Sequence, residues 1–233
     1  ARHHNQRALA VAEQLQDTLR QARVHFNLAT IAARGEESEA ATLHFEQAMA
    51  LYQAIGDQVR VELTRTNMGA FFVSTRRYHL AIAAARQALG FFERIQFADW
   101  VALNAINLSE SYIALEDYGL AEQYASQVVA LELTAHMPNV LTILGTIRLR
   151  QQAFGEAQTL LEEAIEIAQA NTDPYIAAFA WRSMGEVHAA VHDQPKARAA
   201  FEQSLELFSA LRLAPEVERT RALLEALGNS DSR

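Results

Sequence analysis

Three asparagines recur at intervals of 40 residues, at Asn27, Asn67 and Asn107. An asparagine side chain offers both N–H donors and a carbonyl acceptor. A row of such amides can therefore pair with the N–H and C=O groups of an extended peptide without reading its side chains. The same amides can equally hydrogen-bond within the protein or face water, and the sequence leaves both interpretations open.

Other side chains give little support for catalysis or for a cofactor. His188 and His192 stand four residues apart, but no glutamate completes an H-E-x-x-H arrangement. Adjacent acids such as Glu162 and Glu163 fit a solvated helix face. The chain has no cysteine, no glycine-rich phosphate loop and no G-x-S-x-G motif. We therefore expect no catalytic residue, no metal site and no cofactor in these residues.

The composition narrows the kinds of partner. Acidic residues number 28 against 20 lysines and arginines, and the formal net charge is −8. This balance disfavours nucleic acid, because phosphate binding requires a basic surface. No apolar run reaches the length of a membrane span, and the first residues lack the apolar core of a signal peptide. We expect a cytoplasmic protein that contacts neither nucleic acid nor a membrane.

A frame of small and apolar residues repeats along most of the chain. One alanine recurs in each copy, at Ala41, Ala81, Ala121, Ala157 and Ala197. Twelve residues before each alanine stands a small residue, namely Ala29, Gly69, Ser109, Gly145 and Gly185. Successive copies are 40 residues apart, except for one step of 36. A fixed period of this length is the signature of a repeat protein, in which each unit packs on its neighbours.

The fullest copy of the frame is the last one, which reads Trp181-x-x-Met184-Gly185-x-x-His188, followed by Ala197-x-x-x-Phe201. This pattern resembles the tetratricopeptide repeat, a helix–turn–helix unit of about 34 residues. The resemblance implies an all-α fold, a right-handed α-solenoid (superhelix) of antiparallel helix pairs. We expect first helices at 20–34, 58–75, 99–115, 138–151 and 174–190. Second helices are expected at 37–55, 78–95, 118–135, 154–170 and 195–210.

The small residue in each first helix calls for a packing explanation. Glycine costs about 1 kcal/mol in a helix interior, so we expect Gly145 and Gly185 to lie at close helix crossings, with the recurrent alanine opposite. The 36-residue step predicts an irregularity near His136-Met137-Pro138.

The two ends differ from the repeats between them. Residues 8–17 match residues 48–57 at an offset of 40, so we expect 1–19 to be the second helix of a truncated upstream repeat. Five repeats then occupy 20–213. Residues 214–228 are predicted to form a capping helix, with Val217, Leu224 and Leu227 on one side, and 229–233 a disordered tail.

In proteins of this family the first helices line the concave face, so the resemblance places the three asparagines there. Similar asparagines in kinesin light chain and in bacterial peptide-sensing regulators hold a peptide backbone. The candidate groove residues that follow are Asn27, Asn67, Asn107, Arg34, Thr66, Ile106, Glu110, Thr142, Arg150 and Arg182. The paired lysines of chaperone-binding members are absent, because Lys196 is the only lysine.

We therefore expect a binding module, not an enzyme, that holds a protein or peptide segment in a concave groove. Forty-residue repeats resemble the sensor regions of larger bacterial regulatory proteins, so other domains of a parent protein are possible partners. The alternative is a scaffold without a peptide ligand, which self-associates through the truncated N-terminal end.

Overall fold

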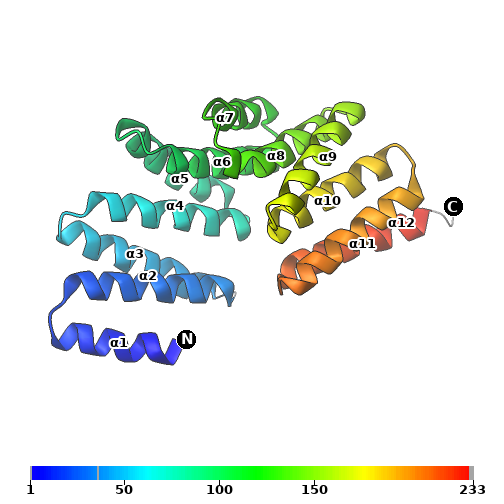
Figure 1. The fold of residues 1–233 in the computed structure, drawn as a ribbon. Coiled ribbons are helices and arrows are strands. Elements are labelled where there is room, and N and C mark those ends of the chain that lie inside the picture. The colour runs from blue at the N-terminus through cyan, green and yellow to red at the C-terminus, as the bar shows by residue number, and fades with distance from the viewer. Residues whose placement is uncertain (1, 36, 231–233) are drawn as a thin grey trace. The chain divides into compact units, whose positions relative to one another are not determined.

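A computed structural model describes residues 2–35 and 37–230, and these ranges are helical apart from short turns. The chain divides into two compact units, residues 1–117 and residues 118–233. Within each unit, consecutive helices pack against one another, as Figure 1 shows for α1 to α6. The all-α, helical-repeat solenoid fold that the sequence predicts is confirmed.

The bounds of the helices are as follows. The first unit contains α1 (Arg2–Gln14), α2 (Thr18–Arg34), α3 (Ser38–Ala54), α4 (Gln58–Ser74), α5 (Tyr78–Arg94) and α6 (Ala98–Ala114). The second contains α7 (Tyr118–Ala130), a 3₁₀ turn η1 (Thr134–His136), α8 (Met137–Arg150), α9 (Phe154–Ala170), α10 (Pro174–Ala190), α11 (Gln194–Ala210) and α12 (Ala214–Ser230). Residues 231–233 of the predicted tail lie outside the described residues, and α12 extends to Ser230.

Turns between the helices share one geometry. Each described turn has one residue in the left-handed region, and these residues are Gln16, Gly56, Arg76, Gln96, Glu116, Glu132, Gln152, Thr172, His192 and Arg212. At a typical turn, the N–H groups of Arg76 and Arg77 donate to the carbonyls of Val73 and Phe72, at 3.0 and 2.8 Å. This is the Schellman pattern, which satisfies the last carbonyls of a helix.

The residue after several of these turns caps the next helix. The carboxylates of Asp17, Asp57 and Asp193 accept from the backbone N–H three residues later, at 2.9, 3.0 and 3.3 Å. Helix end and helix start are thus joined within three residues. A 17-residue helix and this turn together make a 20-residue step, which explains the 40-residue repeat.

The 36-residue step shortens one second helix. We expected a helix over 118–135, and this is wrong, because α7 ends at Ala130 and has 13 residues instead of 17. The predicted irregularity near Pro138 is confirmed as η1, which precedes α8. Proline has no N–H and its ring clashes with the carbonyl four residues earlier, at Thr134. The turn before Pro138 is therefore wound as a 3₁₀ helix.

Close helix crossings at Gly145 and Gly185 are confirmed. A Cβ atom at Gly185 would lie 2.5 Å from Cδ1 of Phe201, and one at Gly145 would lie 2.7 Å from Cγ of Leu161. At Gly145 the recurrent alanine does lie opposite, since the Cβ would be 3.3 Å from the backbone oxygen of Ala157. In both crossings, however, the nearest atoms belong to the side chain four residues after that alanine. Gly69 has more room, since its Cβ would meet the Ala84 Cβ at 3.7 Å.

Both terminal helices dock on their neighbours. On α1, Ala12 is completely buried, and its carbonyl accepts from Nε2 of Gln21 on α2 at 3.1 Å. At the other end, Leu227 of α12 joins Ala197 and Phe201 of α11 in one apolar cluster. The first and last helices thus cover the repeats that they adjoin.

Replacing Gly185 with alanine should destabilise the protein. Phe201 is 1% exposed, so its ring has no free space to move into, and overpacking commonly costs about 1–3 kcal/mol. Gly69→Ala is the matched control, because its methyl group fits and the helix gains up to about 1 kcal/mol. Urea denaturation followed by circular dichroism should give opposite shifts for the two variants. Equal shifts would contradict the crossing argument.

Candidate binding surfaces

The three asparagines differ in exposure although they occupy equivalent repeat positions. Asn27 is exposed on α2, Asn67 is half-buried on α4, and Asn107 on α6 is only 7% exposed. The Asn67 amide donates to the carbonyl of Leu63 at 2.8 Å, and no other hydrogen bond of this side chain is found within residues 2–35 and 37–230. Asn27 and Asn67 are therefore the accessible amides of the row.

Asn107 belongs to the joint between α4 and α6. Its Nδ2 lies 3.5 Å from the backbone oxygen of Thr66, a long contact. The stronger bond of this joint comes from Asn104, whose Nδ2 donates to Oγ1 of Thr66 at 2.9 Å. Thr66 and Ile106 are 3% and 4% exposed. Thr66 and Asn107 thus belong to the contact between two first helices, and Ile106 is buried on α6.

Asn104 was missed by the sequence analysis. It stands three residues before Asn107 and is completely buried, so the available signal was a second polar residue on the buried face of a first helix.

The candidate groove residues of the second unit also make polar contacts within the protein. Thr142 is buried, and its hydroxyl donates to the carbonyl of Pro138 at 2.8 Å. Arg150 on α8 forms an exposed ion pair with Glu186 on α10, at 2.7 Å. The remaining candidates are Arg34, exposed at the end of α2, and Glu110, half-buried on α6.

Arg182 is the most deeply buried charge in the candidate set, at 6% exposed. Its guanidinium carbon lies 4.9 Å from the ring centre of Phe179 and 5.2 Å from that of Phe208. The guanidinium also donates to the carboxylate of Glu216 on α12. This combination of ring contacts and an ion pair ties α10, α11 and α12 together.

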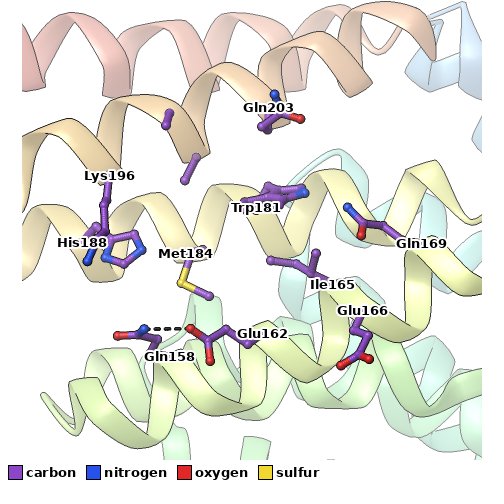
Figure 2. Close-up of a pocket in the computed structure, with 12 residues that line it drawn as sticks. Gln158, Glu162, Ile165, Glu166, Gln169, Trp181, Met184, His188, Lys196 and Gln203 are labelled. Atoms are coloured by element: carbon purple, nitrogen blue, oxygen red, sulfur yellow. Dashed lines mark hydrogen bonds between the residues drawn. The ribbon is translucent and has the colours of Figure 1, made fainter.

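A cleft of about 590 Å³ opens between α9, α10 and α11. Figure 2 shows Ile165, Trp181 and Met184 at its centre, with the glutamines Gln158, Gln169 and Gln203 around them. Glu162 and Glu166 line the α9 side, and His188 and Lys196 lie together at one end. Its volume suits a small ligand or a few side chains. The sequence analysis did not identify this cleft.

A pair of histidines joins α2 to α3. The Nδ1 atoms of His25 and His44 lie 3.0 Å apart, and Nδ1 of His44 also lies 3.1 Å from Oε1 of Gln47. Burial, followed by the neighbouring His44, lowers the pKa of His25 below 6.5, while Glu13 of α1 acts in the opposite direction. One of the two Nδ1 atoms must lack a proton for this contact to be a hydrogen bond, and the lowered pKa of His25 favours its neutral form.

Neither a metal centre nor a membrane span emerges from the described residues. No group of three or more histidine, cysteine or acidic side chains is placed to hold a metal ion there. His188 is buried, whereas His192 is exposed in a turn. Among the helices of residues 2–35 and 37–230, none combines the length and apolarity needed to cross a bilayer.

Comparisons with known proteins support the fold. A tetratricopeptide repeat family model matches residues 136–210. BtubC (BKLC) from P. vanneervenii is 18% identical with a TM-score of 0.70, and the match covers 91% of both chains. A Rap protein complexed with competence and sporulation factor is 14% identical with a TM-score of 0.68, over 98% of this chain and 70% of the other.

Aspartyl phosphate phosphatase F from Bacillus subtilis is also similar, with 10% identity and a TM-score of 0.64. That match covers 90% of this chain but spans 60% of the length of the phosphatase. A search of curated protein sequences found no match. At sequence identities this low, the structural similarity shows only that the fold is shared.

Removing Glu216 should destabilise the second unit, because it leaves the buried Arg182 charge unpaired. We expect Glu216→Ala to lower the free energy of unfolding by about 1.5–3 kcal/mol. Glu218→Ala is the matched control on the same helix, since its ion pair with Arg221 is exposed and such pairs contribute about 0–1 kcal/mol. Similar losses for both variants in thermal denaturation would contradict the structural role of Arg182.

The histidine pair should make stability fall as the pH decreases through 6.5. Unfolded His25 binds a proton near pH 6.5, whereas folded His25 does so only at lower pH, so protonation favours the unfolded state. The loss continues until the pH is below the folded pKa. His25→Gln should weaken this dependence in urea denaturation at pH 7.5 and 5.5. An unchanged difference between the two pH values would contradict it.

Proposed function

Since residues 136–210 match a tetratricopeptide repeat family model and consecutive helices pack in pairs within both units, we propose that this chain is a protein-interaction module that binds an extended peptide segment. The binding surface is the exposed face of the first helices in the first unit, which carries Asn27 and Asn67 and is called the asparagine face below. Its central contacts are the accessible amides of Asn27 on α2 and Asn67 on α4. The module acts as a ligand-sensing or partner-sensing part of a larger bacterial regulatory protein.

The observation that carries this proposal is a polar stripe on α2. Arg23, Asn27 and Arg34 are all exposed, and their spacing places them on one face of the helix. On α4, Leu63 and Asn67 occupy the positions equivalent to Arg23 and Asn27, and both are half-buried. Amides at equivalent positions suit the repeating backbone groups of an extended chain, and the arginines suit acidic side chains.

The similar structures support this proposal at the level of fold. One of them is a Rap protein in complex with competence and sporulation factor, so a related helical array binds a partner molecule. In this chain, the accessible amides of Asn27 and Asn67 are the groups proposed to bind the partner.

Self-association is the second candidate, and one observation favours it. Val11 on α1 and Leu15, the residue directly after α1, are 48% and 63% exposed. Apolar side chains at the end of a repeat array are a surface on which a second copy can stack. This reading predicts that α1, and not the asparagine face, controls assembly.

Asn67→Ala should weaken peptide binding by about 1–3 kcal/mol, the usual cost of leaving a bound partner group unpaired. Folding should change little, because the one bond lost is to its own helix. Peptides selected from a random 12-residue display library on the wild-type protein supply the ligand, and calorimetry measures its affinity. Arg34→Ala should reduce the preference for acidic peptides and the salt dependence of association.

Matched controls are Asn171→Ala and Arg198→Ala, two exposed positions of the second unit. If Asn67→Ala binds like wild type while Leu15→Ser changes the sedimentation coefficient, the self-association reading replaces the peptide-binding one.

A further inference from the structure

The cleft between α9, α10 and α11 shares no residue with the asparagine face. It belongs wholly to the second unit and is bounded by two second helices, with α10 between them. Ile165 and Met184 are buried members of the core, and Trp181 is half-buried against it. The cleft therefore exposes part of the apolar core through a polar rim.

The preceding repeat carries a larger side chain at one of two positions equivalent to those in the cleft wall. The positions of Trp181 and Ala200 correspond to Leu141 and Leu160, at an offset of 40 residues. All four side chains belong to one apolar cluster, in which Leu141 and Ala200 are buried and Leu160 and Trp181 are partly buried. Ala200 and Trp181 both line the cleft, and the side chain of Ala200 is only a methyl group. A leucine at this position, as at Leu160, would therefore fill part of the cleft.

His188 lacks the partners that its counterparts have. The equivalent Arg148 forms ion pairs with Glu122 at 2.6 Å and Glu156 at 3.0 Å, and the equivalent Tyr112 accepts from Arg86 at 2.6 Å. His188 is 9% exposed and lines the cleft. Neither ring nitrogen of His188 makes a hydrogen bond to another residue in 2–35 or 37–230. A buried, unpaired imidazole at a cleft wall is a hydrogen-bonding group available to a ligand.

Charge on the α9 side of the cleft is also uncompensated. Glu162 and Glu166 are exposed one turn apart, and like charges at this spacing repel. Neither carboxylate has an ion-pair partner in the part of the chain that the structure describes; Glu162 accepts only from Nε2 of Gln158, at 2.7 Å. Lys196, the cation of the cleft, is engaged by Asp193 at 3.1 Å. The rim is therefore complementary to a cation.

We propose that this cleft is a second binding site, for a basic protein segment that inserts one large apolar side chain. The apolar side chain packs on Trp181 and Met184. A lysine or arginine beside it pairs with Glu162 and Glu166, and a backbone or side-chain donor of the segment bonds to His188. The rim glutamines offer further donors and acceptors to the segment's backbone. This site is independent of the asparagine face proposed above.

Three nonapeptides with blocked ends test the proposal. Each has one central leucine flanked by glycine and serine, with lysine, glutamine or glutamate on both sides of the leucine. Binding is followed by calorimetry and by the fluorescence of Trp181 in a Trp100→Phe background. The lysine peptide should bind and change this fluorescence, and the glutamine and glutamate peptides should bind at least about tenfold more weakly.

The variants locate the site. Ala200→Leu restores the side chain of the preceding repeat and should abolish binding. Glu162→Gln with Glu166→Gln should weaken the lysine peptide about tenfold and reduce its salt dependence. Glu163→Gln, an exposed neighbour on α9 that does not line the cleft, is the matched control and should bind like wild type. Circular dichroism checks that each variant is folded.

Three results would overturn the proposal. One is no binding of the lysine peptide up to about 1 mM, the weakest affinity of interest. Another is equal affinity for the lysine and glutamine peptides. The third is binding that survives Ala200→Leu but is lost in Asn67→Ala, which would place the peptide on the asparagine face. The asparagine-face proposal stands or fails on its own selected peptides, so the two failures are distinguishable.

Discussion

Close contact between the two helices of a repeat is the constraint on which the rest of this structure depends. At Gly145 and Gly185 no side chain separates the helix backbones from Leu161 and Phe201, and even a methyl group would overlap these residues. Where the crossing carries alanine, at Ala29, that residue is completely buried too. Because side chains meet with so little clearance, the angle and register of each pair are fixed, and every neighbour must pack against a defined surface.

The turns transmit this register from one helix to the next. A left-handed residue at the helix end, followed in several cases by an aspartate cap, joins consecutive helices in three residues. Gly56 is the one glycine among the described left-handed positions, although non-glycine residues there cost about 1–2 kcal/mol. The geometry persists because packing on both sides requires it. Where the chain loses four residues, α7 shortens and the turn geometry is kept at Glu132.

Polar side chains on the first helices serve two purposes that depend on the neighbouring helix. In the joint between α4 and α6, Asn104 and Thr66 form a buried hydrogen bond. Around Arg182, two aromatic rings and Glu216 replace the water that a guanidinium loses on burial. Among the described residues of the first unit, no such contact with a neighbouring helix is made by Asn27, Asn67, Arg23 or Arg34. They give the asparagine face a cationic character, whereas the α9–α11 cleft is apolar and acidic.

By itself, the sequence determined the properties that depend on nearby residues and on the repeat period. Helix positions such as 174–190, the breaks at aspartate and proline, and the crossings at Gly145 and Gly185 all follow from local propensity and from the steric size of one residue. Tertiary structure decided what each helix face meets. Asn27 and Asn107 hold the same repeat position, yet one is exposed and the other buried, because a neighbouring helix covers only the second. The cleft likewise depends on the individual side chains that α9, α10 and α11 bring together. The repeat period predicts which helices pack on each other, whereas the space left between them depends on the packing of each side chain.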